Sequence, residues 1–229
     1  MNRLQALTDI VLALALTVAA GYASARLVGA VEGTTALGGV IVVQGLIILI
    51  GLRLLLVRRR QGWRDIGLVR FAAVDIGRGV RALLLVIAVN VVLTVAANRL
   101  APALVTEHTQ RLQGFAAALT GGMPFAVVTL LAVFIGIYEE LLARGLLLRR
   151  ALLLLPGTWG PVLFSAVIFG AGHIYQGWVG VMQTTAVGLV LATLSLRWGS
   201  LWPAIIAHAA LNTWSLGLLR LLEQGHLSP

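Results

Sequence analysis

Apolar stretches of about twenty residues alternate with short polar segments along nearly the whole chain. A helix that crosses a bilayer needs about 20 mostly apolar residues, and its backbone must satisfy its own hydrogen bonds because lipid offers none. The pattern therefore predicts an all-α protein, a polytopic bundle of about seven transmembrane helices. We expect the spans at residues 7–28, 36–57, 76–97, 124–154, 158–175, 179–197 and 200–222. A single membrane domain, residues 1–229, is the simplest organisation because no internal repeat interrupts the pattern.

The composition supports a membrane protein and excludes several other classes. Of the 229 residues, 59% are hydrophobic and 11% are charged, whereas a soluble domain has about half apolar and about a quarter charged residues. All 17 basic residues are arginine, and the net charge is +9. Because the arginines flank the apolar stretches, they indicate contact with the lipid bilayer rather than with nucleic acid. The chain contains no cysteine, so disulfides and thiolate chemistry are excluded.

The positions of the arginines predict an orientation. Arg58, Arg59 and Arg60 follow the second span, Arg150 lies near the end of the fourth, and Arg197 closes the sixth. Positive charge is enriched in cytoplasmic segments, so these positions predict a cytoplasmic N-terminus. A composition rich in arginine, alanine and leucine suggests a high-GC bacterium. We therefore expect a multi-pass protein of the bacterial inner (plasma) membrane.

Two polar segments connect predicted spans, and the hydropathy pattern does not determine their structure. Residues 98–123 form the longest polar stretch and include His108, and we expect an external loop with room for a short interfacial helix. Residues 63–70, WRDIGLVR, have the mixed character of an amphipathic connector at the membrane surface.

Four acidic or histidine residues lie well inside the predicted spans, away from their ends. The chain has eight acidic residues and four histidines, and most of them lie at span ends or in loops. The exceptions are Glu139, Glu140, His173 and His208. A charged side chain at the bilayer centre costs about 2.5–3.5 kcal/mol on insertion scales, so such residues are candidates for a functional site.

Helix geometry predicts that these residues meet. Glu140 precedes the Pro156-Gly157 turn by 16 residues, and His173 follows it by the same distance, which puts them at similar depth on two antiparallel helices. His208 and Asn212 are spaced i, i+4 and share one face of the last span, again near the cytoplasmic side. We expect these side chains to converge in one cavity of the cytoplasmic half.

Each polar residue also has a plain structural interpretation. Arg144 alone is typical of a cytoplasmic flank. His173, or His208 with Asn212, can simply join neighbouring helices by hydrogen bonds. Packing requires no adjacent glutamates, however, so the pattern as a whole favours a functional site.

Three short motifs carry a family resemblance. EELLAR (139–144), FGAGH (169–173) and HAALN (208–212) resemble the EExxxR, FxxxH and HxxxN motifs of the CPBP (Abi) family. That family comprises intramembrane proteases, among them CAAX proteases and bacteriocin-processing enzymes. The resemblance covers about residues 124–215, so we expect the catalytic core in the C-terminal four spans, residues 124–222.

The resemblance implies hydrolysis of a peptide bond in a membrane-associated protein or peptide. In such a family Glu139 and His173 would activate a water, and His208 and Asn212 would stabilise the oxyanion. Glu140 and Arg144 would complete the set. Helical spacing adds that Glu140 and Arg144, at i, i+4, can form an ion pair, whereas Glu139 is rotated about 100° away.

The sequence leaves alternatives open on two points: whether a metal takes part, and whether the protein is an enzyme. Two histidines and a glutamate can bind catalytic zinc, so a zinc-dependent version of the same protease is possible. We favour a reaction without metal or other cofactor, because HExxH is absent and an arginine beside the carboxylates disfavours a cation. A non-enzymatic scaffold or immunity protein of the same fold is the other alternative. A proton-coupled transporter is disfavoured, since the spans show no inverted repeat.

Overall fold

The structure, a computed structural model, describes residues 1–28, 36–120 and 123–223, and over these residues it consists of helices without β-strands. Five helical segments in the described residues are long and apolar enough to cross a membrane. They are Arg3–Leu27, Leu37–Arg58, Val74–Leu100, Phe125–Leu154 and Ile174–Trp198. The expected all-α membrane bundle is thereby confirmed.

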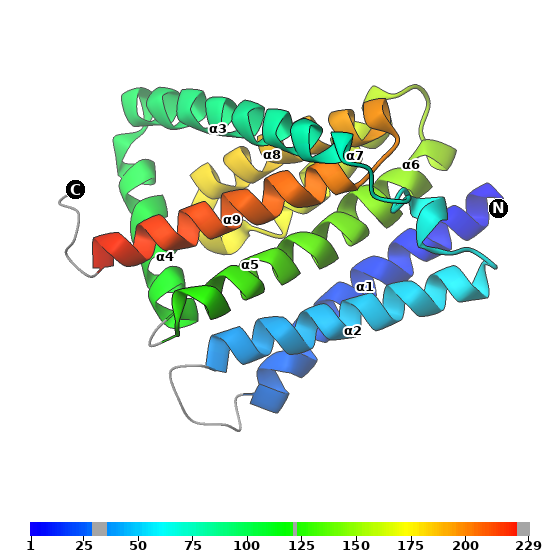
Figure 1. Ribbon diagram of the computed structural model, residues 1–229, viewed down its shortest axis with the longest axis horizontal. Helices are drawn as coiled ribbons and strands as arrows, with labels where there is room; N and C mark the ends of the chain where they lie inside the picture. Colours follow the sequence, from blue (N-terminus) through cyan, green and yellow to red (C-terminus); the bar gives the residue numbers. More distant parts are fainter. Residues whose placement is uncertain (29–35, 121–122, 224–229) are drawn as a thin grey trace.

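The helices follow the predicted spans closely. Their bounds are α1 Arg3–Val28, α2 Ala36–Arg58, α3 Val74–Leu100, α4 Pro102–Thr120, α5 Phe125–Glu140, α6 Leu148–Leu154, α7 Trp159–Ala171, α8 Gly177–Trp198 and α9 Trp202–Glu223. The long helices lie roughly side by side, and α1 begins at the end of the bundle opposite to the end of α9 (Figure 1).

Two of the predicted spans are not among the five long apolar segments found in the described residues. α7 has only 13 residues, because its helix ends at Ala171 and the chain turns through a short 3₁₀ helix, Ile174–Gln176. α9 has 22 residues but is not among the five apolar segments, and it carries the polar residues His208 and Asn212 in its middle. Among the described residues, five segments thus meet the length and hydropathy criteria where seven spans were predicted, because α7 is short and α9 carries polar residues.

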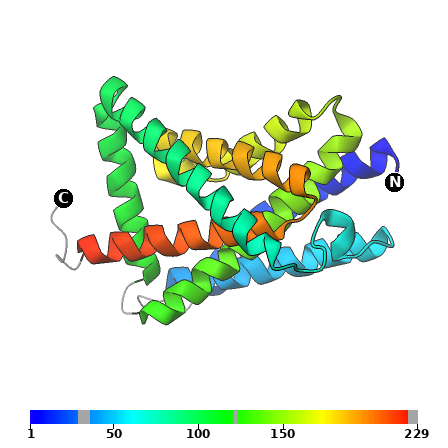
Figure 2. The ribbon, with the colours of Figure 1, turned by 45° about the horizontal axis from the view of Figure 1, so that its top comes forward.

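The segment 98–123, predicted as a loop with room for a short interfacial helix, is helical over most of its length. α4 is a helix of 19 residues that stands across the end of the bundle, beside the ends of the long helices (Figures 1 and 2). It packs against α2, α3, α8 and α9. Pro102 at its first position was the available signal, since proline favours the first turn of a helix.

A π-helix, Leu141–Leu147, joins α5 to α6 and contains most of the EELLARG segment. The backbone N–H of Leu148 donates to the carbonyl of Ala143, five residues earlier. Ser165 of α7 donates its hydroxyl to the same carbonyl at 2.8 Å. A side chain of the neighbouring helix thus helps to satisfy the backbone of the widened turn.

A close approach of α5 and α9 brings the motifs together. A Cβ atom at Gly136 would lie 3.0 Å from the backbone nitrogen of Ala209 and 3.1 Å from its Cα. Only glycine allows the two helices to lie this close. Because Glu139 and Glu140 follow Gly136 by about one turn and His208 precedes Ala209, the contact sets the glutamates beside His208.

A buried ionic cluster ties α1 and the segment after α2 to α6. Asp9 is fully buried, and its two oxygens pair with Arg59 Nη2 at 2.7 Å and with Arg150 Nε at 3.0 Å. Arg150 also donates to Gln61 Oε1 at 2.6 Å. The sequence placed Asp9 at a span end without a role, because its partners lie far away along the chain.

Candidate active site

Glu140 and Arg144 form the predicted ion pair at the junction of α5 and the π-helix. Arg144 Nη1 lies 2.7 Å from Glu140 Oε1, and both side chains are fully buried. The guanidinium also lies over the ring of Phe169, with Cζ 4.2 Å from the centroid, a cation–π geometry. Phe169 thus covers the charged pair, which explains the aromatic residue of the FGAGH motif.

His208 bridges the two glutamates. Its Nδ1 lies 2.8 Å from Glu140 Oε1, and its Nε2 lies 3.6 Å from Glu139 Oε2. An ionised carboxylate only accepts hydrogen bonds, so Nδ1 is the donor to Glu140. One oxygen of Glu140 therefore accepts from both Arg144 and His208, which fixes that glutamate and the imidazole relative to each other.

His173 presents its second nitrogen toward Glu139. Its Nδ1 lies 2.8 Å from the carbonyl oxygen of Phe169, which can only accept, so Nδ1 carries a proton. In the neutral ring Nε2 is then an acceptor, and it lies 4.0 Å from Glu139 Oε2. This separation suits two acceptors that share one water at about 2.8 Å from each.

Glu139 is the less constrained of the two glutamates. Its side chain is 20% exposed, whereas Glu140 is fully buried. Its Oε2 has no hydrogen-bond partner among the described residues, and its Oε1 lies 3.5 Å from the hydroxyl of Tyr138. An acceptor that is held near two imidazoles without a bond of its own is suited to accept a proton from water.

A cavity of about 400 Å³ lies in front of these residues, and Glu139, His173, His208 and Asn212 all contribute to its wall. Glu140 and Arg144 do not line it and lie behind it in the protein. Other polar residues, none of them among the predicted site residues, also line the cavity: Gln44, Asn90, His108, Tyr138, Tyr175, Gln176, Gln183, Thr184 and Ser215.

His108 is the clearest residue that sequence reasoning misplaced. It was assigned to an external loop, but it lies on α4, is 8% exposed and lines the cavity. Its Nδ1 donates to the carbonyl of Gln176 at 2.8 Å. Since Gln176 follows His173 by only three residues, α4 holds the turn that carries His173.

The donor side chains of the described residues do not form a metal site. Within this part of the chain, no group of three histidine or carboxylate side chains has a geometry that could hold a metal ion. Glu140 Oε1 already has two partners.

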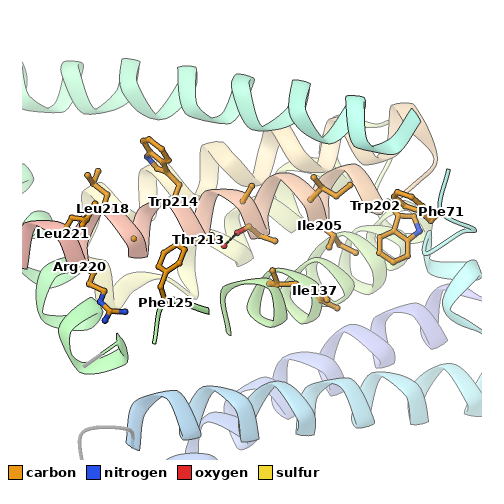
Figure 3. A pocket seen from close by; sticks show the side chains of 15 residues that line it. Phe71, Phe125, Ile137, Trp202, Ile205, Thr213, Trp214, Leu218, Arg220 and Leu221 are labelled. Atoms are coloured by element: carbon orange, nitrogen blue, oxygen red, sulfur yellow. Dashed lines mark hydrogen bonds between the residues drawn. The ribbon is translucent and has the colours of Figure 1, made fainter. Parts of the chain in front are cut away.

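A second, larger cavity of about 1150 Å³ lies on the outer side of α5 and α9. Its wall is almost wholly apolar and follows α9 from Trp202 to Leu221, with Phe125 and Ile137 of α5 opposite (Figure 3). None of the predicted site residues lines it. The predicted site residues that are accessible therefore line the smaller, polar cavity.

A helical bundle with apolar membrane spans and a buried set of carboxylates and imidazoles is an integral membrane protein with an acid–base site. Residues 121–214 match the family model described as type II CAAX prenyl endopeptidase Rce1-like. This segment contains all three motifs, so the resemblance predicted from the motifs is confirmed. No curated protein and no solved structure matches the chain.

Proposed function

We propose that the protein is an intramembrane endopeptidase that hydrolyses a peptide bond of a membrane-associated protein or peptide. The observation that carries this proposal is the arrangement around Glu139, whose unbonded Oε2 faces Nε2 of His173 at 4.0 Å and Nε2 of His208 at 3.6 Å. The match of residues 121–214 to the model of a protease family supports the reaction class.

In the proposed reaction a water lies between Glu139 and His173. The two acceptors take one proton as the water oxygen attacks the carbonyl carbon of the substrate. The carbonyl oxygen becomes an oxyanion, which His208 and Asn212 stabilise by hydrogen bonds. The C–N bond then breaks, the proton passes to the departing nitrogen, and the products are a carboxylic acid and an amine.

The tautomer of His208 sets a condition on this role. Its Nδ1–H donates to Glu140, so Nε2 can donate to an oxyanion only when the ring carries protons on both nitrogens. The carboxylates on either side of the ring, Glu140 and Glu139, complement such a cation. Glu140 and Arg144 act as positioning residues behind the cavity.

A glutamate-dependent reaction without metal fits these residues better than a zinc reaction. The guanidinium of Arg144, 2.7 Å from Glu140, puts a positive charge beside the two carboxylates, and this charge disfavours a second cation there.

The orientation and the membrane are part of the proposal. The arginine distribution supports a cytoplasmic N-terminus, an active site toward the cytoplasm and residence in a bacterial inner membrane. In the structure Arg59 and Arg150, predicted to lie on the same side, share the carboxylate of Asp9.

Comparative peptide analysis of membranes tests the function. Cells that express the wild-type chain and cells that express Glu139→Ala at the same level are compared by mass spectrometry of membrane peptides. We expect a full-length membrane substrate to accumulate with Glu139→Ala and its fragments to disappear. Identical peptide populations at equal protein levels would contradict the proposal.

A further inference from the structure

Tyr138 stands directly before Glu139 on α5 and belongs to none of the three motifs. Its hydroxyl lies 3.5 Å from Glu139 Oε1 and makes no other hydrogen bond with the described residues. An ionised carboxylate only accepts hydrogen bonds, so the phenol is the donor in this contact.

This contact is the only hydrogen bond that the described residues make with the Glu139 carboxylate. Its Oε1 accepts from Tyr138, whereas its Oε2 has no partner. Glu140, in contrast, is held at one oxygen by Arg144 at 2.7 Å and by His208 at 2.8 Å. The two oxygens of a carboxylate move together, so the direction in which Glu139 Oε2 points depends on what holds Oε1.

The ring of Tyr138 is itself fixed, partly by α2. The residue is 6% exposed, and its ring packs against that of Phe134, one turn earlier, with centroids 5.4 Å apart. A Cβ atom at Gly45 of α2 would lie 2.7 Å from Cδ1 of Tyr138 and would also overlap the ring of Phe134. Glycine at this position therefore leaves the room that both rings occupy.

The bond between Tyr138 and Glu139 is unusual for its place in a helix. Adjacent helical residues do not face each other, yet both residues contribute to the wall of the polar cavity, and the hydroxyl reaches Oε1. The separation of 3.5 Å exceeds the usual O–H···O range of about 2.5–3.0 Å. Hydrogen bonds of catalytic groups are often long before substrate binds and shorten in the complex.

We infer that Tyr138 is a positioning residue whose hydroxyl holds Glu139 Oε1, so that Oε2 faces the reacting water. Gly45 sets this contact by leaving room for the ring. The inference rests on the proposed function, because it explains how the base of that reaction is oriented by a third group. It also gives α2, which lies outside the matched residues 121–214, a part in arranging the site.

The first arm of the test needs no substrate. The tyrosine doublet of the ultraviolet resonance Raman spectrum reports how strongly a phenol donates a hydrogen bond. Subtracting the spectrum of Tyr138→Phe isolates the signal of Tyr138 from those of the other two tyrosines. We expect a stronger donor signal beside Glu139 than in the Glu139→Gln chain, because a carboxylate accepts more strongly than an amide. The same Tyr138 signal in both chains would overturn the inference.

The second arm measures cleavage of a quenched fluorescent peptide of alanine and leucine in detergent. Tyr138→Phe keeps the ring and removes the hydroxyl, so the thermal midpoint should stay close to that of the wild type. We expect kcat to fall about tenfold, because the base loses the group that orients it, and KM to change by less than about twofold. An unchanged kcat, or a fall in kcat only in step with the amount of folded protein, would overturn the inference.

The third arm tests the link to α2. Gly45→Ala displaces the ring, so it should lower kcat in the chain with Tyr138 and lower it little further in Tyr138→Phe. Gly51→Ala is the matched control on the same helix, because the atoms nearest to its Cβ all belong to Leu16. The control should lower the thermal midpoint without lowering kcat. Independent, additive losses from Gly45→Ala and Tyr138→Phe would overturn the link to α2.

The outcomes separate this inference from the proposed function. A Tyr138 signal that depends on Glu139, in a chain that cleaves no peptide, would contradict only the proteolysis. Cleavage with the wild-type kcat in Tyr138→Phe would contradict only the positioning role of Tyr138.

Discussion

At the scale of single residues, the neighbours of two adjacent glutamates give them different environments. Glu140 is fully buried and accepts from Arg144 and His208, whereas Glu139 faces the cavity with an unbonded oxygen. The sequence predicted the ion pair, since i, i+4 spacing suffices for it. It could not predict that His208 bonds to Glu140, because that contact depends on how closely α5 and α9 pack.

The first prediction separates the two glutamates by substitution. Glu139→Gln should lower turnover by about 10²–10⁴-fold, the range of a lost general base, and should leave the thermal midpoint nearly unchanged. Arg144→Ala should cost about 3–5 kcal/mol of stability, because it leaves Glu140 buried without its cation. Thermal unfolding in detergent and cleavage rates check both. An active Glu139→Gln chain beside a folded but inactive Glu140→Gln chain would reverse the assignment.

The second prediction concerns metal. Dialysis of the purified enzyme against a strong chelator should leave its cleavage rate within about twofold, because glutamate and histidine activate the water without a Lewis acid. Metal content by elemental analysis, measured beside activity, provides the check. Stoichiometric zinc whose removal abolishes activity and whose return restores it would favour the zinc-dependent alternative.

At the scale of the helices, hydropathy predicted which segments are helical and where most of them end. The fourth span, expected at 124–154, is found as Phe125–Leu154. α4 was missed because its polar residues carry no membrane signal, although they cover the end of the cavity. The π-helix was missed because a run of apolar residues fits α and π winding equally well. The two windings are distinguished by contacts with other parts of the fold, such as those of Ser165 and Gly145.

The third prediction tests the contact between α4 and the turn of His173. His108→Phe removes the donor to the Gln176 carbonyl and should lower kcat about tenfold, because small displacements of catalytic groups are costly. KM should change less. His108→Asn keeps a donor and should recover part of the rate. Equal rates for the Phe and Asn variants would mean that the bond does not position His173.

At the scale of the whole molecule, the fold places chemistry and apolar surface on opposite faces of the same helices. α9 contributes His208 and Asn212 to the polar cavity and Ala209 and Thr213 to the apolar one. Residue spacing alone predicted the polar face. The depth of each cavity depends on helix crossing angles and close contacts such as Gly136 with Ala209, which the sequence pattern does not specify.

The fourth prediction concerns topology. Single cysteines introduced at Arg58 and at Gln113, both exposed, should be labelled from opposite sides by a membrane-impermeant maleimide. The natural chain lacks cysteine, so it serves as the background control. The position of Arg58 should react only after the cytoplasmic side is opened. Labelling of both positions from one side would contradict the predicted orientation.

The π-helix implies an uneven tolerance to deletion. A π turn holds about one residue more than an α turn, so loss of Leu142 can be absorbed by a return to α winding. Arg144 would then stand at i, i+3 from Glu140, a spacing that still permits an ion pair. Deletion of one residue between His208 and Asn212 cannot be absorbed in this way, because this part of α9 is already α-helical. We expect cells to retain folded protein after the first deletion and to degrade it after the second, as immunoblots of membranes would show.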